Sequence, residues 1–175
     1  MKRREFLKNS LAGASALCLA PVMTACTAQD LSTAHALNLI DKLKASPHLR
    51  SVGTQTPYQI IMHCVQSVDC ALVGYPEMKA SWFQRSIGQA AFHAFSIMDT
   101  MKHDRTAPIP GMPAAEAEGD VQKALARLEV SFRTLQAAGE VKPHFFFGPL
   151  SHQDMERVQV MHFLNHLELL KWKQA

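Results

Sequence analysis

The sequence predicts an all-α fold. Apolar residues recur along most of the chain at intervals of three and four, the period of an amphipathic helix, and strand signals are scarce. The chain has 175 residues, of which 47% are hydrophobic, and this is enough for one domain with a sizeable core. Glycine and proline residues separate the helical stretches and mark one long irregular segment between them.

Residues 1–28 are predicted to be an export signal, followed by the folded domain at 29–175. Residues 2–8 (KRREFLK) resemble the twin-arginine motif, and the apolar stretch after them, 11–20, is too short to span a bilayer as a helix. The twin-arginine route carries folded proteins, often with a cofactor already inserted. We therefore expect a periplasmic protein.

The end of this leader leaves two possibilities open. Residues 23–26 (MTAC) resemble a weak lipobox, in which Cys26 would be lipidated and would anchor the protein to a membrane. Met23 stands where leucine is usual, and cleavage after Ala25 or Ala28 would instead release a soluble protein. The sequence favours neither outcome over the other.

The net charge of +3 belongs to the leader. Residues 1–28 hold four basic residues and one acidic residue, and the remaining chain holds 14 of each. A near-neutral mature domain has no basic field to attract a phosphate backbone, so nucleic-acid binding is not expected.

Five helical segments are predicted in the mature chain. The second is the most clearly marked, because Thr56, Pro57 and Gln59 form a capping-box start and Gly74 ends it. The third is predicted to place Phe83, Ile87 and Met98 on its core side. The predicted helices span 31–45, 57–74, 79–101, 120–138 and the segment that opens at Ser151.

The segment 102–119 breaks the helical pattern. Its prolines, Pro108, Pro110 and Pro113, are incompatible with a regular helix and predict an extended crossover. Long irregular connections are uncommon in small domains, and they often shape a functional site.

The final helix carries two histidines, His162 and His166, four residues apart. This spacing brings both imidazoles to one face with a rise of about 6 Å, so they could chelate one metal ion. They fall on the apolar stripe of the helix, where an imidazole needs a partner. The alternative is a pair of core histidines bonded to neighbouring side chains.

Three residues of the second helix could also carry chemistry. His63, on the second helix, is flanked by small and polar residues and could be a third ligand or a partly exposed surface histidine. Cys64 and Cys70 lie on the same helix with a rise of about 9 Å between them, too far for a disulfide, so both are expected to be free thiols.

These motifs together resemble the DinB-like (YfiT-like) superfamily, and more narrowly one branch described as a domain of unknown function. The resemblance spans most of the mature chain, and its carriers are residues 63–68 and 74–76, 107–111, 144–150 and 161–166. It implies a metalloenzyme-like four-helix bundle with up-down-down-up connectivity, a long crossover and one additional helix. We assign the additional helix to residues 79–101. The resemblance assigns the metal-ligand roles to His63, His162 and His166.

The resemblance implies an exported metal-binding protein, and a metal-dependent enzyme of thiol-dependent transferase or hydrolase type. The expected cofactor is a divalent ion, Zn or Ni first and then Fe or Mn. His144 is our candidate for an acid/base role, although it could instead cap the turn before the last helix. The expected partners are a small-molecule substrate, which could be a thiol, and a second copy of the chain in a homodimer.

Two other functions remain open at the level of sequence. A non-catalytic periplasmic metal-binding module would use the same three histidines but would have no substrate cavity. A structural lipoprotein would have satisfied core histidines and no metal. A buried apolar cavity beside the histidines would favour the enzyme over the module.

Overall fold

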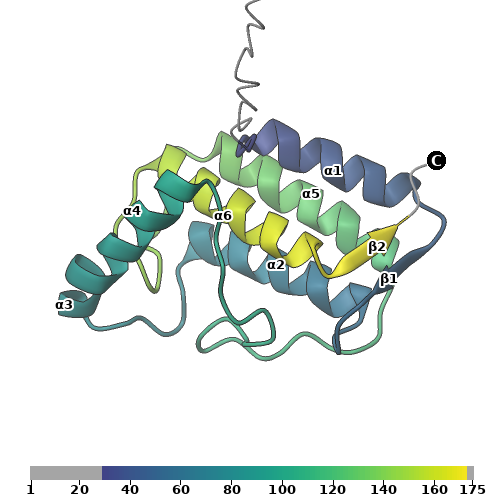
Figure 1. Cartoon of the computed structure of the whole chain (residues 1–175), viewed down its shortest axis with the longest axis horizontal. Coiled ribbons are helices and arrows are strands. Elements are labelled where there is room, and N and C mark those ends of the chain that lie inside the picture. Colours follow the sequence, from purple (N-terminus) through teal and green to yellow (C-terminus); the bar gives the residue numbers. More distant parts are fainter. Residues whose placement is uncertain (1–28, 173–175) are drawn as a thin grey trace, which may run out of the picture.

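The computed structural model describes residues 29–172, so the predicted leader lies outside the described residues. Within this range the chain is mostly helical, which confirms the all-α class in its coarse form (Figure 1). None of the described helices is both long and apolar enough to cross a bilayer. The elements are α1 (Thr33–Ala45), β1 (Leu49–Ser51), α2 (Pro57–Val73), α3 (Ser81–Phe83), the π-helical turn η1 (Gln84–Gly88), α4 (Gln89–Met98), α5 (Val121–Ala137), α6 (His152–Leu167) and β2 (Leu170–Trp172).

The four longer helices, α1, α2, α5 and α6, pack around one hydrophobic core (Figure 1). Each contributes side chains with almost no exposed surface, and this burial is the main source of stability for such a fold. The largest of them are Ile40, Leu43, Ile60, Ile61, Leu125, Leu128, Phe132, Leu135, Met155 and Phe163.

The helix starts follow the predicted capping residues. The Thr56 side chain accepts from the Gln59 N–H, and the Gln59 side chain accepts from the Thr56 N–H, which completes the capping box of α2. Asp120 caps α5 and Ser151 caps α6 with side chains that accept from N–H groups of the first turn, without the return bond of a capping box. These local bonds determine where the helices begin, and hence where the histidines of α2 and α6 lie along them.

A small antiparallel sheet, absent from the sequence-based prediction, closes one end of the molecule. Leu49 pairs with Trp172, and Ser51 pairs with Leu170. Each strand has only three residues, too few for an alternating pattern to distinguish a strand from a loop.

The helix predicted at 79–101 forms from Ser81 to Met98, but its predicted core side is wrong. Ile87 and Met98 are exposed, at 51% and 57%, whereas Gln84 and Gly88 are buried. The reason is that this helical segment packs on the turn before α6 and not on the central core. The Gln84 and Gln89 side chains donate to the carbonyl oxygens of Phe145 and Phe147, at 3.0 and 2.6 Å.

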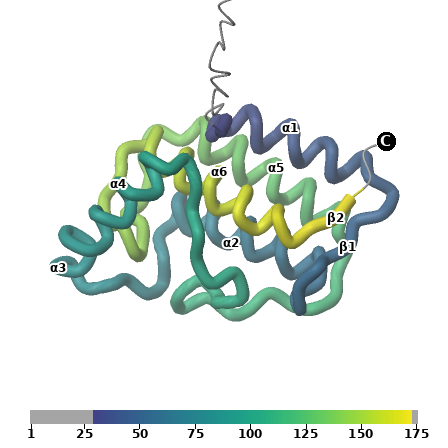
Figure 2. The backbone as a smooth tube through the Cα atoms, in the orientation of Figure 1, coloured from purple at the N-terminus to yellow at the C-terminus, as the bar shows by residue number. Residues whose placement is uncertain are grey.

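The crossover 102–119 is irregular, as predicted, and much of it lies along α2 (Figure 2). Two α2 side chains and the N-cap residue donate to carbonyls of alternate crossover residues: Gln66 to Pro113 at 3.1 Å, Gln59 to Ala115 at 3.3 Å, and Thr56 to Ala117 at 2.6 Å. These bonds satisfy backbone groups that no helix or sheet pairs, and they hold the crossover against the molecule.

Replacing Gly88 by Ala should destabilise the protein. A Cβ atom there would overlap the backbone oxygen of Phe146, which is part of a hydrogen-bonded turn and cannot move freely. We expect the free energy of unfolding to fall by about 1–3 kcal/mol in chemical denaturation. Gly139→Ala is the matched control, because a Cβ atom at Gly139 would meet nothing within 4 Å. Equal stability of the two variants would contradict the packing of η1 on this turn.

Candidate metal centre

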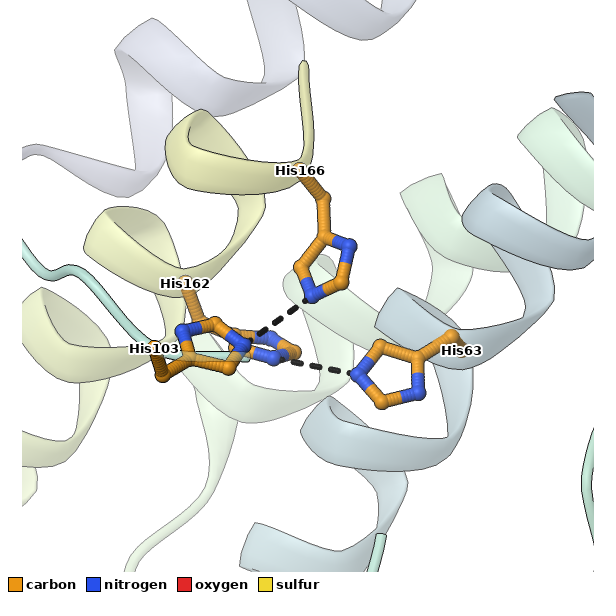
Figure 3. Close-up of side chains that lie close together, drawn as sticks. All are labelled: His63, His103, His162 and His166. Atoms are coloured by element: carbon orange, nitrogen blue, oxygen red, sulfur yellow. Dashed lines mark hydrogen bonds between the residues drawn. The ribbon is translucent and has the colours of Figure 1, made fainter. Parts of the chain in front are cut away.

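Four histidines converge between α2, α6 and the crossover (Figure 3). His63 comes from α2, His162 and His166 come from α6, and His103 comes from the crossover. One nitrogen atom from each ring lies within 4.8 Å of the others, an arrangement that could hold a metal ion. The structure therefore brings together the three histidines singled out in the sequence and adds a fourth.

The ring nitrogens meet in two pairs (Figure 3). Nε2 of His63 lies 3.2 Å from Nε2 of His162, and Nε2 of His103 lies 3.2 Å from Nε2 of His166. In each pair one nitrogen donates and the other accepts, so only one ring of the pair carries its proton on Nε2. The His103 and His162 rings also stack, with centroids 4.9 Å apart and planes 24° apart.

Burial keeps the three helical imidazoles neutral. His63, His162 and His166 are 6%, 7% and 0% exposed. Desolvation, with a smaller effect of His103, lowers the pKa of His63 to about 4. Desolvation and the neighbouring histidines lower the pKa of His162 well below its usual value, and that of His103 is also lowered, mainly by desolvation. Neutral imidazoles have the free lone pair that a metal ion requires.

The donor set fits a divalent metal ion. Two nitrogens bound at about 2.0–2.1 Å to a tetrahedral ion lie about 3.4 Å apart, close to the two 3.2 Å pairs. The ligand nitrogens of the other pairs are at most 4.8 Å apart, so the side chains would have to move by about 1 Å to bind one ion together. Among residues 29–172, Nδ1 of His166 is buried and has no hydrogen-bond partner, so the described protein groups satisfy only one nitrogen of this ring.

His103 was missed from the sequence. A lone histidine in an irregular segment has no periodicity that would place it on a particular face. The one available signal was that a long, proline-rich crossover often shapes a site, and this prediction concerned the segment without naming a residue.

A polar network ties α2 to α6 beside the histidines. The Ser67 hydroxyl donates to Oε1 of Gln159 at 2.8 Å, and Nε2 of Gln159 donates to the Tyr75 hydroxyl at 3.1 Å. Gln159 is fully buried, one turn before His162, and Ser67 lies one turn after His63. The network therefore sets the spacing of the two helices at the level of the cluster.

A cavity of about 350 Å³ adjoins the cluster. His63, His103 and His162 face it, and most of the remaining wall is apolar. The apolar lining includes Phe95, Met101, Ile109, Phe145, Phe146, Phe147 and Val158. The volume is within the range of small-molecule sites, and apolar walls with a few convergent polar groups are typical of them.

His144 also lines this cavity, outside the four-histidine cluster. Its Nδ1 accepts from the N–H groups of Phe146 and Phe147 at 3.2 and 3.3 Å, so the neutral ring carries its proton on Nε2. Burial lowers the pKa of His144 to about 3. The turn-capping role considered from the sequence is present, and the ring still faces the cavity.

Three residues near His63 in the sequence have other surroundings. Gln59 bonds to Thr56 and Ala115, and Tyr58 packs over Gly119. Cys70 packs with Tyr75 and Ile109 and does not line the cavity. Cys64 and Cys70 are both buried free thiols, as predicted.

The fold and the cluster define a helical protein with a four-histidine site that could bind a metal ion beside an apolar cavity. The chain belongs to the DUF1569 family, a protein family of unknown function, whose model matches residues 27–173. No curated protein and no solved structure matches the chain.

Replacing His144 by Asn should weaken the dependence of stability on pH. An ordinary histidine pKa is about 6.5 in the unfolded chain and His144 has a pKa of about 3 when folded, so the unfolded state binds the proton more readily. The stability that the neutral His144 ring contributes to the folded state is fully present above pH 6.5 and is lost as the pH falls toward 3. The slope of the free energy of unfolding against pH should therefore be smaller in the variant, by up to about 1.4 kcal/mol per pH unit between pH 6 and 4.

Urea unfolding at a series of pH values, with chelator present throughout, measures this slope. Asn retains an acceptor for the Phe146 and Phe147 N–H groups, which keeps the turn itself intact. His93→Asn, at an exposed histidine of α4, is the matched control for the substitution itself. An unaltered slope in His144→Asn would show that the ring is not held neutral by burial.

Proposed function

We propose that this protein is an exported metal-binding protein and a metal-dependent enzyme. Its metal ligands are His63, His162 and His166, joined by His103. The observation that carries the proposal is the convergence of four neutral imidazoles at the wall of an apolar cavity of about 350 Å³. The cavity favours an enzyme over a metal-binding module, since a module needs no space for a substrate.

The architecture we propose is the DinB-like four-helix bundle with up-down-down-up connectivity and α3–α4 as the additional helical segment. Contacts at the helix ends support this order. Gln122, at the start of α5, donates to the Lys44 carbonyl at the end of α1, and the His152 ring, at the start of α6, lies 2.7 Å from the Leu135 carbonyl at the end of α5. Asp69 of α2 pairs with Arg127 and Ser131 of α5. These contacts suit parallel α2 and α5 joined by a long crossover.

The ligand chemistry favours Zn, Ni or Fe over Mn, and Zn or Ni stay the ions we propose first. All four donors are imidazoles, and the cluster contains no carboxylate, the ligand type that Mn prefers. When bound, such an ion would act as a Lewis acid toward water, which suits hydrolysis, or toward a thiol, which suits thiol-dependent transfer.

The chain's own residues would bind and orient the substrate. The Phe145, Phe146 and Phe147 side chains provide an apolar wall that excludes water from the site. His144 presents a proton on Nε2 and is our candidate acid/base residue. The substrate is a small molecule, and a thiol fits the proposed transfer chemistry.

Metal analysis of the mature domain, purified without a histidine tag, tests this proposal. We expect about one divalent ion per chain, and its loss in the triple variant His63→Ala/His162→Ala/His166→Ala. His162→Ala alone should abolish metal retention and lower the melting temperature. His93→Ala is the control, because His93 is exposed and outside the cluster. No metal in the wild type, even after addition of Zn or Ni, would leave the histidines with a structural role.

We also propose that the protein reaches the periplasm by twin-arginine export, with or without a lipid anchor at Cys26. Replacing Arg3 and Arg4 together by Lys should block export, because the translocation machinery recognises the arginine pair. Fractionation of cells that express the full chain measures the periplasmic share. Lys2→Arg is the charge-matched control and should be exported normally. Normal periplasmic accumulation of the double-lysine variant would contradict the proposed route.

A further inference from the structure

His103 differs from the other three histidines of the cluster in how it is held. His63, His162 and His166 project from helices and are buried, whereas His103 belongs to the irregular crossover and is exposed. Anchors stand on both sides of it: Met101 is buried, and Arg105 donates to the Asn165 carbonyl at 3.3 Å and to Glu168 at 2.9 Å. His103 lies between these anchors, so it can leave the cluster without unfolding a helix.

His103 belongs both to the cluster and to the cavity wall. It lines the cavity together with His63 and His162, and its Nε2 reaches into the cluster toward His166 (Figure 3). Movement of this one side chain would therefore vacate a coordination position on the cavity side. The three helical histidines would remain as ligands.

The charge balance of the cluster indicates what would take that position. All four donors are neutral, and the nearby carboxylates have other partners: Asp104 accepts from Thr106, and Glu168 pairs with Arg105. A divalent ion bound only by imidazoles keeps its full charge in a buried site, which favours an anionic ligand. Lys79 and Lys102 also line the cavity, against the carboxylate of Asp104, so the charged residues of the wall leave a positive balance.

We propose that His103 is an exchangeable fourth ligand, and that a small molecule with an anionic donor on an apolar body displaces it from the cavity side. The proposal rests on the metal site proposed above. In the exchange, the bond from His103 Nε2 breaks and one from the anionic donor atom forms, with no transfer of a proton or an electron. The apolar wall of the cavity accepts the body of the ligand.

Benzoate and acetate are a matched pair of probes. They share the carboxylate donor, and only benzoate carries a ring that can fill the apolar cavity. With the Co(II)-loaded protein, the d–d spectrum reports a change of ligand directly. We expect benzoate to bind about tenfold more tightly than acetate, because the ring is removed from water.

Two kinds of variant separate the parts of this proposal. His103→Ala should retain Co(II), show an altered spectrum before any probe is added, and bind benzoate more tightly than the wild type, because no ligand has to be displaced. Ala91→Trp should retain Co(II) with the wild-type spectrum and lose the preference for benzoate over acetate, because Ala91 lines the cavity. Ala107→Trp fills the same cavity from the crossover and replaces Ala91→Trp if that variant does not fold.

The outcomes distinguish this inference from the proposed function. If the wild type binds no Co(II), the metal site and the inference fail together. If Co(II) binds but His103→Ala has the wild-type spectrum, His103 is not a ligand. If His103→Ala loses Co(II), or if benzoate leaves the wild-type spectrum unchanged, His103 is a permanent ligand. Each of the last three results would overturn the exchange and leave the metal site standing.

Discussion

The burial of α6 is the constraint on which the rest of this structure depends. Ten of its sixteen residues are buried, among them His162 and His166, because α1, α2 and the crossover enclose it. Burying an imidazole costs free energy unless its nitrogens find partners, and none of the described carboxylates belongs to the cluster. The partners are other imidazoles, His63 and His103. The interior is thus organised around four neutral nitrogen donors.

The crossover 102–119 meets two demands at once. It has no secondary structure of its own, so its backbone groups need partners, and side chains of α2 supply them along much of its length. At its beginning it carries His103 into the cluster and closes one side of the cavity with Pro108, Ile109 and Pro110. The same segment therefore covers α2 and completes the site.

The turn before α6 forms another part of the cavity wall. His144 accepts two N–H groups of this turn, while Gln84 and Gln89 donate to two of its carbonyls. Gly88 allows the close approach, because any side chain there would overlap the Phe146 backbone. A π-helical turn at Gln84–Gly88 accompanies this contact. The three consecutive phenylalanines are in this way held at the cavity wall.

The sequence by itself determined the properties that arise within one element. The caps at Thr56, Asp120 and Ser151 act over three residues, and the spacing of His162 and His166 follows from the helical repeat, so both could be read from neighbouring positions. The resemblance to the DinB-like pattern brought His63 into the same set. Only the tertiary structure decided which face of α3–α4 is buried, because the carbonyls it meets belong to residues 145 and 147. It alone decided that β1 pairs with β2 and that His103 joins the cluster, 63 residues before His166 in the chain. Contacts over such separations depend on how the helices pack, and local periodicity carries no signal for them.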